Sequence, residues 1–210
     1  LEQENKLKLA HAVMNGEDNE RHRIARELHE GVGGTLSAEK LRLSAEEQDN
    51  NTSGIEESIA QLDGSITDLR NIARNLMPET LIRSGIDVAL KDLCASLGSK
   101  ALQIEYQSYD IGPNIPKDKQ LNIYRIVQEL LANSIRHGRA SYILVQCSQE
   151  QNKFLITIED NGKGFAMKSN DKKMGMGLNN IKKRVELMQG IFDLNSEINE
   201  GTTANIELYV

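Results

Sequence analysis

One histidine occupies a position where an imidazole could take part in chemistry. His29 lies in the charged run from Glu20 to Leu36, and Glu30 directly follows it. An accessible imidazole is both a nucleophile and a proton carrier near neutral pH, because its unperturbed pKa is about 6.5. A histidine on the charged face of a helix is also an ordinary surface residue, and this run alone leaves both interpretations open.

A second set of polar residues recurs at every fourth position. Glu129, Asn133 and His137 are spaced in this way in the run QELLANSIRHG, so a helix would present them on one face. An amide oxygen at Asn133 suits Mg²⁺, Glu129 can orient a proton or a metal-bound water, and His137 can donate to phosphate. The alternative is an ordinary solvated helix face.

A single carboxylate at the end of a predicted strand carries the sharpest inference. In the run FLITIED the apolar residues alternate in phase with Asp160, so its side chain should point toward the core. A buried charge is costly unless it meets a donor. Gly162 and Gly164, just after it, allow the backbone to approach a flat ligand closely. The alternative is a strand-end aspartate that caps a turn.

Spacing excludes two other kinds of site. Gly162 and Gly164 follow a strand, but no third glycine arrives where a dinucleotide-binding fingerprint requires it. The run HEGVG lacks the second histidine of a zinc-protease helix, because Gly33 stands in its place.

Further along, Met174–Leu178 leads into a predicted helix, whose N-terminus would favour phosphate.

Together these runs resemble a sensor histidine kinase of the subfamily that partners LuxR/NarL-type response regulators. The run RIARELHE, which contains His29, looks like the phosphoacceptor box of that family. Later segments are similar to its ATP-binding boxes, in the expected order. These are the N box around Glu129 and Asn133, the G1 box Asp160–Gly164, the G2 box Met174–Leu178 and the late pair Gly201–Thr202.

The resemblance implies ATP-dependent phosphorylation of His29, followed by transfer to an aspartate of a response regulator. It assigns the Nδ1 proton of the histidine to Glu30 and a base-like or positioning role to Glu129, which makes these three residues the catalytic set. Neighbouring residues do not face each other on a helix, so pairing of Glu30 with Arg26 is the alternative. It also implies that Asp160 accepts a hydrogen bond from the adenine amino group. ATP and Mg²⁺ are the expected cofactors, with Asn133 as the metal ligand. The predicted nucleotide-binding set is Asn133, His137, Asp160, Gly162, Gly164, Gly175, Gly177, Leu178 and Thr202.

One position departs from the subfamily, and two other functions stay open. A glutamine four residues after the acid positions water for dephosphorylation of the regulator, but Gly34 stands there, so we expect weak phosphatase activity. The first alternative function is a GHKL-type ATPase or Ser/Thr protein kinase, which would need Asn133 and Asp160 but not His29. The second is a non-catalytic dimeric scaffold that binds nucleotide as a structural clamp.

Two amphipathic helices should carry His29. The first runs to about Gln48, where the turn-forming cluster Asp49–Gly54 ends it, and the second is closed by Pro78. Apolar residues of the first form a stripe at Ile24, Leu28, Val32 and Leu36. Those of the second alternate spacings of three and four at Ile55, Ile59, Leu62, Ile66, Leu69, Ala73 and Leu76. A lone hairpin cannot cover this seam, which predicts a homodimeric four-helix bundle.

After Pro78 the pattern changes to mixed helices and strands. Expected helices are 86–97, 118–137 with Asp118 as its cap, and 178–189; expected strands are 102–106, 141–148, 153–159, 191–198 and 202–210. This indicates a two-layer α/β sandwich, and the resemblance implies the Bergerat fold shared by histidine kinases, type II topoisomerases and Hsp90. The expected class is α+β with two domains, a helical dimerisation and phosphoacceptor domain at 1–78 and an ATP-binding domain at 79–210.

Composition narrows the partners and the compartment. The net charge of −6 argues against non-specific nucleic-acid binding, which needs a basic face. Cys94 and Cys147 lie in apolar contexts and should be small buried hydrophobes in a reducing compartment. No apolar run approaches the roughly 20 residues that cross a bilayer, so we expect this part of the protein to be cytoplasmic. The chain begins without Met, which leaves an upstream sensor or membrane segment open.

Overall fold

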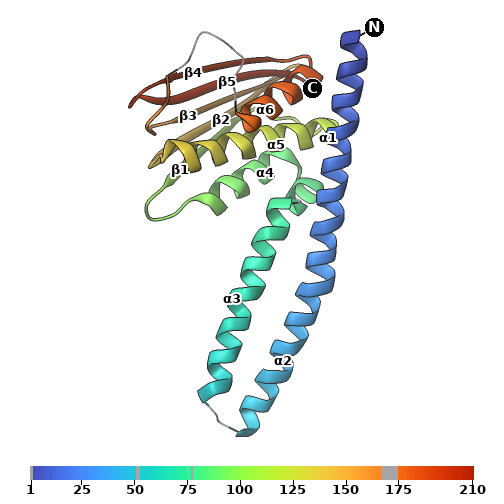
Figure 1. The fold of residues 1–210 in the computed structure, drawn as a ribbon, viewed down its shortest axis with the longest axis vertical. Helices are drawn as coiled ribbons and strands as arrows, with labels where there is room; N and C mark the ends of the chain where they lie inside the picture. The colour runs from blue at the N-terminus through green and yellow to red at the C-terminus, as the bar shows by residue number, and fades with distance from the viewer. Residues whose placement is uncertain (1, 51–52, 77, 167–174) are drawn as a thin grey trace. The chain divides into compact units, whose positions relative to one another are not determined.

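The computed structural model describes residues 2–50, 53–76, 78–166 and 175–210. The chain divides into two compact units, Leu1–Glu79 and Thr80–Val210. The described part of the first unit is helical, and the second combines a five-stranded sheet with helices (Figure 1). Within the described residues, no helix is both long and apolar enough to cross a bilayer.

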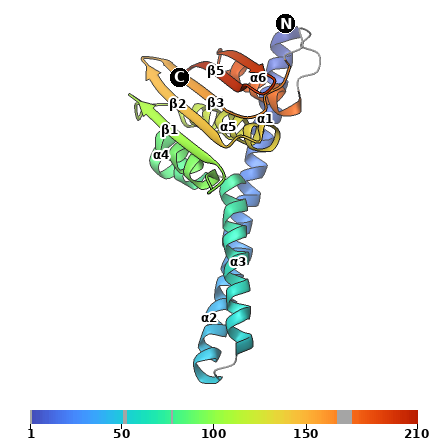
Figure 2. The same cartoon turned by 90° about the vertical axis from the view of Figure 1, so that its left-hand side faces the viewer.

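The first unit is an antiparallel helical hairpin. One arm is continuous through α1 (Glu2–Arg26), the π-helical turn η1 (Glu27–Val32) and α2 (Gly33–Asn50). The other arm, α3 (Ser53–Leu76), returns beside it (Figure 1, Figure 2). The connection is shorter than the predicted turn Asp49–Gly54, because the helices extend into it from both sides. Its centre, Asn51 and Thr52, lies outside the described residues.

An apolar seam with the predicted spacing of three and four holds the hairpin together. Every predicted seam position of α3 is half-buried or buried, and Ile66 and Ala73 are the most buried of them. Burial of such side chains stabilises the folded state by about 25 cal/mol for each Å² of apolar surface removed from water. At the edge of the seam, Nζ of Lys40 on α2 forms an ion pair of 2.6 Å with Oδ1 of Asp63 on α3. The predicted helical hairpin is therefore confirmed.

The second unit contains α4 (Glu79–Leu97), which is broken at one glycine. Gly85 has φ 81° and ψ −179°, a conformation that glycine adopts at far lower cost than other residues. The sequence predicts only the part of this helix after Gly85, because the segment Glu79–Ser84 is too short to show an apolar period. The helix ends as predicted before Gly98, whose N–H bonds back into the last turn.

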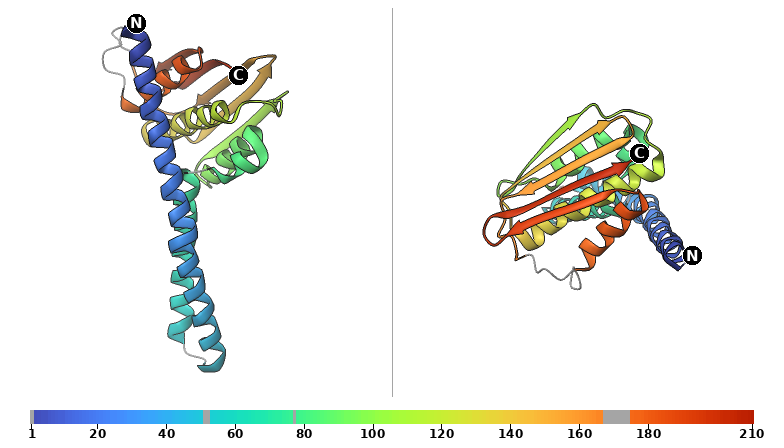
Figure 3. Two further views of the ribbon diagram at one scale, coloured as in Figure 1. Left: turned by 90° about the vertical axis from the view of Figure 1, so that its right-hand side faces the viewer. Right: turned by 90° about the horizontal axis from the view of Figure 1, so that it is seen from above.

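Five strands form one mixed sheet in the order β1-β2-β3-β5-β4 (Figure 3). β1 runs parallel to β2, and every other neighbouring pair is antiparallel. The strands are β1 (Gln103–Tyr109), β2 (Tyr142–Glu150), β3 (Lys153–Asp160), β4 (Ile191–Glu197) and β5 (Gly201–Tyr209). Each predicted strand is present with small shifts at its ends, whereas the strand order comes from the structure alone.

Helices cover one face of this sheet (Figure 1, Figure 3). They are α4, α5 (Lys117–Asn133), which continues into a second π-helical turn η2 (Ser134–Gly138), and α6 (Met176–Leu187). The prediction that Asp118 caps α5 is wrong. Pro116 occupies the N-cap, and Asp118 lies inside the first turn, where a carboxylate still interacts favourably with the helix dipole.

The core of the second unit lies between the sheet and these helices. Phe154, Ile156 and Ile158 of β3 are all buried, as their alternation predicts. Cys94 and Cys147 are free thiols in this core. Burial raises the pKa of Cys94 to about 12 and also raises the pKa of Cys147. Both thiols therefore stay protonated near neutral pH and pack as small apolar side chains, as predicted.

Candidate functional site

His29 lies on the hairpin in a turn wider than an α-helical one. It belongs to η1, where the N–H of Gly33 donates to the carbonyl of Leu28, five residues earlier. The side chains of His29 and Glu30 are both exposed. A π-helical turn holds an additional residue and is frequent at functional sites. The structure thus leaves the imidazole open to solvent.

The additional residue changes which side chains face the hairpin seam. Leu28 is half-buried as predicted, but Val32 is 47% exposed, so its place in the predicted stripe is wrong. Gly33 faces the seam instead, because a Cβ at this position would lie 3.5 Å from Cδ2 of Leu69 on α3. Leu28 and Gly33 are five residues apart, and the wide turn brings such a pair onto one face.

Deletion of Gly31 should test this register. It would place Leu28 and Gly33 four residues apart, so that an ordinary α-helical turn could satisfy the seam. We expect the free energy of unfolding to rise by about 1 kcal/mol, because a residue of low helix propensity is lost.

The matched control is deletion of Gly64, an exposed residue of the regular helix α3. This deletion should move half of the α3 seam off its face and lower the free energy of unfolding by about 3 kcal/mol or more. Urea unfolding followed by circular dichroism would compare the two variants. Equal losses of stability would contradict the register.

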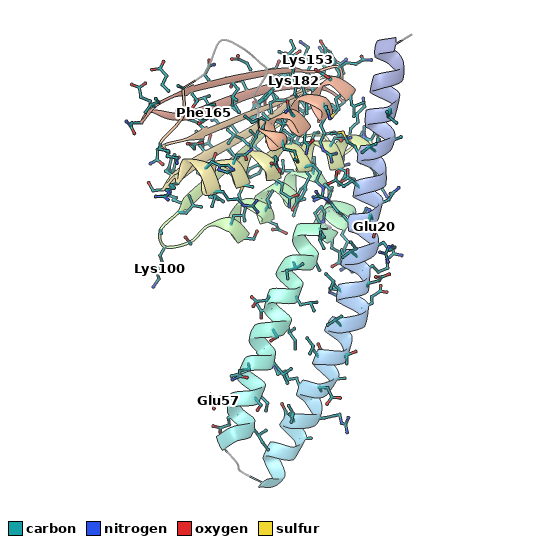
Figure 4. The ribbon with its side chains drawn as sticks, viewed as in Figure 1. Glu20, Glu57, Lys100, Lys153, Phe165 and Lys182 are labelled. Atoms are coloured by element: carbon teal, nitrogen blue, oxygen red, sulfur yellow. The ribbon has the colours of Figure 1, made fainter. Side chains whose placement is uncertain are left out.

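Acidic residues just before His29 are engaged by one arginine. Nη2 of Arg23 lies 2.6 Å from Oε1 of Glu20, and its Nη1 lies 2.5 Å from Oε1 of Glu27. The hydrogen bond from Arg23 lowers the pKa of Glu20, which is labelled on α1 in Figure 4. Among the described residues, His29 and Glu30 have no hydrogen-bond or ion-pair partner. Glu30, the next residue after His29 in the chain, is thus an acid that no arginine of the described residues engages.

A buried carboxylate at the end of β3 is the centre of the second set of candidate residues. Asp160 is 5% exposed, as its phase in the strand predicts. Oγ of Ser134 donates to its Oδ2 at 2.6 Å, and the N–H of Gly162 donates to its Oδ1 at 2.8 Å. Asp160 therefore caps the following turn and is also buried. Because a carboxylate oxygen can accept about two hydrogen bonds, each oxygen keeps a lone pair for a ligand.

The loop after Asp160 packs tightly against other backbone. A Cβ on Gly162 would lie 2.7 Å from both Oδ1 of Asp160 and the carbonyl oxygen of Gly138. A Cβ on Gly164 would overlap the carbonyl oxygen of Glu197. The sequence predicts these glycines for close approach to a ligand, whereas the structure shows that the protein's own backbone already requires them.

Ser196 joins this loop to the neighbouring strands. It is buried on β4. Its Oγ accepts a hydrogen bond from the N–H of Phe165 at 3.0 Å (Phe165 is labelled in Figure 4). The same hydroxyl donates to the carbonyl oxygen of Gly201 at 2.9 Å. Its hydroxyl is also 3.0 Å from Oγ1 of Thr202. Thr202 is half-buried and pairs with Asp160 in the register of β3 and β5, so the structure brings these two predicted residues together.

Polar residues of α5 meet the beginning of α6. A Cβ on Gly177 would overlap Oε1 of Glu129 and would lie 3.5 Å from Nδ2 of Asn133. Glu129 and Asn133 therefore share a face, as predicted. His137 follows four residues later in the π-helical turn η2, where its side chain is exposed.

The N-terminus of α6 is the last part of the set. Gly175 is its exposed N-cap, and Leu178 is half-buried against the core. The first N–H groups of a helix have no partner within it and favour an anion such as phosphate. Met174, the first residue of the predicted G2 box, lies outside the described residues.

Asn133 is the residue whose surroundings fit a magnesium ion. Its Nδ2 is buried without a hydrogen-bond partner among the described residues. A half-turn of the amide would present its oxygen at this position, and oxygen is the ligand that Mg²⁺ prefers. In the described ranges no three His, Cys, Asp or Glu side chains gather as a metal site. Mg²⁺ commonly takes one or two protein ligands together with water and phosphate, so Asn133 and Glu129 fit it.

Two family models match separate parts of the chain. A model described as histidine kinase matches residues 20–81, which include His29. A model described as histidine kinase-, DNA gyrase B- and HSP90-like ATPase matches residues 118–210, which include Asn133 and Asp160. The chain belongs to the histidine kinase family. The resemblance seen in the sequence is confirmed.

Curated relatives of this histidine kinase family member are named as histidine kinases. Oxygen sensor histidine kinase NreB of Staphylococcus carnosus is 28% identical over 209 residues, which cover 96% of this chain and 59% of NreB. The histidine-protein kinase/phosphatase DegS of Brevibacillus brevis is 27% identical over 205 residues, which cover 93% of this chain and 53% of DegS. Sensor histidine kinase ComP of Bacillus subtilis is 30% identical over 204 residues, which cover 91% of this chain and 26% of ComP. The chain therefore spans little more than half the length of the first two relatives.

Solved histidine kinase structures share the fold of this family member. The blue-light activated kinase of Erythrobacter litoralis EL346 has a TM-score of 0.53 at 16% identity, covering 83% of this chain and 59% of that chain. Full-length ShkA in complex with AMPPNP has a TM-score of 0.51 at 16% identity, covering 91% of this chain and 46% of ShkA. At these identities the likeness concerns the fold alone.

Sequence reasoning missed two residues of the candidate site in this kinase family member, Ser134 and Ser196. Ser196 carried a signal, because it alternates in phase with the buried Leu194 along β4. Ser134 directly follows Asn133 and belongs to the buried face of its helix, but its partner Asp160 lies 26 residues further along the chain. Only the packing of η2 against the end of β3 reveals that contact.

Proposed function

We propose that this chain is the catalytic core of a two-component sensor histidine kinase, which phosphorylates His29 from ATP and passes the phosphoryl group to an aspartate of a LuxR/NarL-type response regulator. The observation that carries the proposal is an exposed His29 in the segment that matches the histidine kinase model. The same chain holds an ATPase-like unit with a buried, donor-bound Asp160. Its relatives are named sensor kinases, and the rest of the full protein is proposed to carry the sensor.

The two units divide the work in this proposal. Residues 1–78 provide the phosphoacceptor and the dimer contact, and residues 79–210 bind ATP. The exposed apolar side chains Val32, Leu41 and Ile72 on the hairpin support pairing with a second copy into a four-helix bundle, because such side chains gain stability when buried.

ATP would be bound by the residues around Asp160. The carboxylate has lone pairs for the amino group of adenine, and Thr202 lies beside it on β5. The glycines 162, 164, 175 and 177 and Leu178 form the loops and the helix start next to the nucleotide, and the exposed His137 would donate to a phosphate oxygen. Asn133 would hold Mg²⁺, which neutralises phosphate charge when bound, and Glu129 on the same face would orient a proton or a metal-bound water.

The chemical step uses the neutral imidazole of His29. The lone pair of Nε2 forms a bond to the γ-phosphorus, the bond from this phosphorus to the bridging oxygen breaks, and ADP leaves. Glu30 holds the Nδ1 proton, which fixes the tautomer and balances the positive charge of the ring. Because Glu27 is held by Arg23, Glu30 is the acid available for this role. Positioning of ATP contributes most of the remaining rate enhancement.

Incubation of the chain with ATP labelled at the γ-phosphate, with Mg²⁺, tests the proposal. Phosphohistidine is lost in acid and survives alkali, whereas phosphoserine and phosphothreonine survive acid. Acid-labile label that maps to the peptide containing His29 is the expected result. Acid-stable label would indicate a Ser/Thr kinase instead, and nucleotide binding without any turnover would indicate a scaffold.

Substitution of Gly34 by glutamine should increase the phosphatase activity toward the phosphorylated regulator. In the unmodified chain no amide stands at this exposed position of α2, one helical turn after Glu30, and we expect weak dephosphorylation. A Cβ at position 34 meets no atom within 4 Å, so the side chain can be added without distortion. We expect the rate to rise about tenfold or more, since positioned groups contribute factors of this size or greater.

The control for this substitution is Gly34→Ala, which fills the position without an amide. The loss of labelled phosphate from a purified receiver domain would be measured for all three chains. Strong phosphatase activity in the unmodified chain, or equal activity in both variants, would refute the role of the amide.

A further inference from the structure

Ser134 is the one side chain that donates to Oδ2 of Asp160 among the described residues. Its hydroxyl lies 2.6 Å from that oxygen, and both residues are buried. The backbone of Ser134 is held as well, because its carbonyl accepts from the N–H groups of Arg139 and Ala140 where η2 ends. The hydroxyl is therefore fixed in position by the fold of the turn.

The turn η2 and the loop after β3 enclose the carboxylate from two sides. The N–H of Lys163 donates to the carbonyl of Gly138 at 2.8 Å, which ties the loop to the turn. The position that a Cβ on Gly138 would take is 3.5 Å from Oδ1 of Asp160. With Gly162 donating to Oδ1 and Ser134 to Oδ2, the carboxylate has one donor from the described residues on each oxygen and little freedom to rotate.

The hydrogen-bonding character of this corner follows from these contacts. The single hydroxyl hydrogen of Ser134 is donated to Asp160. The oxygen of Ser134 and the oxygens of Asp160 can therefore only accept hydrogen bonds from a ligand. A ligand therefore meets a cluster of acceptors. An exocyclic amino group supplies two N–H donors to such a cluster, whereas a ring oxygen or an unsubstituted carbon supplies none.

We propose that Ser134 is a positioning residue for the nucleotide base, whose hydroxyl holds the Asp160 carboxylate with its free lone pairs toward an exocyclic amine. This inference rests on the proposed function, because it takes the bound ligand to be an adenine nucleotide. It assigns Ser134 a role in base selection, beyond satisfying a buried charge.

Binding of two triphosphates by the full chain separates base selection from a merely structural role. ATP carries the 6-amino group, and purine riboside triphosphate lacks it but is otherwise the same. In Ser134→Ala we expect the affinity for ATP to fall about tenfold, since a lost hydrogen bond to a charged group has effects of this size. The affinity for purine riboside triphosphate should change less than twofold. Calorimetry would provide all the dissociation constants.

The matched control is Ser96→Ala on α4. Its hydroxyl donates to the carbonyl of Leu93 at 2.8 Å, and its removal should leave both affinities unchanged. Equal losses for the two nucleotides in Ser134→Ala, or no loss for ATP, would overturn the proposal. If that variant does not fold, the unmodified chain still decides, because binding ATP no better than purine riboside triphosphate would also overturn it.

Failure of this inference about Ser134 can be distinguished from failure of the proposed kinase function. Binding requires no phosphoryl transfer, so base selection without any phosphorylation of His29 would overturn the proposed function alone. Phosphorylation of His29 with no effect of Ser134→Ala on the choice of base would overturn this inference alone.

Discussion

Replacement of His29 by alanine is expected to abolish the acid-labile phosphate that the chain acquires from ATP and Mg²⁺. The imidazole supplies the nucleophile in the proposed step, and no methyl group can replace it. We expect the rate of labelling to fall by about a thousandfold or more, as it does when a nucleophile is removed from other enzymes. The affinity for ATP should not change, because His29 takes no part in the contacts around Asp160. Labelling with γ-phosphate-labelled ATP and a separate binding titration would measure the two effects.

The matched control is His22→Ala, which removes a half-buried imidazole from the same helical arm but outside η1. It should label at a rate within about twofold of the unmodified chain. Glu30→Gln should label about ten to a hundred times more slowly, because the Nδ1 proton then lacks a charged partner. Acid-labile phosphate that persists in His29→Ala would show that another residue is the acceptor.

Substitution of Asp160 by asparagine is expected to weaken ATP binding by about a hundredfold. The carboxylate accepts from Ser134 and Gly162 and keeps lone pairs for the ligand. An amide of the same shape must place its NH₂ group toward one of these donors or toward the adenine amine, where two donors would then face each other. Loss of one charged hydrogen bond and desolvation of the unpaired donor together cost about 2.7 kcal/mol, which corresponds to that factor.

Asp193→Asn is the control for this second prediction. Asp193 lies exposed on β4 and accepts from the side chain of Asn195 at 2.9 Å, so the same chemical change is made far along the chain from Asp160. Titration with a fluorescent ATP analogue would measure both variants, with thermal melting to confirm that each is folded. Affinity within about threefold of the unmodified chain in Asp160→Asn would show that this carboxylate does not hold the base.

The sequence by itself determined the features that depend on short-range periodicity. Apolar spacings of three and four identify α3 and its seam, because an α-helix returns to the same face after this interval. Alternation along FLITIED places Asp160 in the core, because successive strand residues point to opposite faces. Spaced motifs around His29, Asn133 and Asp160 then indicate the family, and the family models agree.

Tertiary structure decided what periodicity cannot encode. The π-helical turns η1 and η2 interrupt the regular helical period, and at η1 Val32 is exposed while Gly33 faces the seam. A wide turn forms when packing on both sides of it outweighs regular helical hydrogen bonding, and that balance is not visible in the local pattern. The contacts of Ser134 and Ser196 are likewise between residues distant in sequence, and they depend on the strand order, which only the assembled sheet establishes.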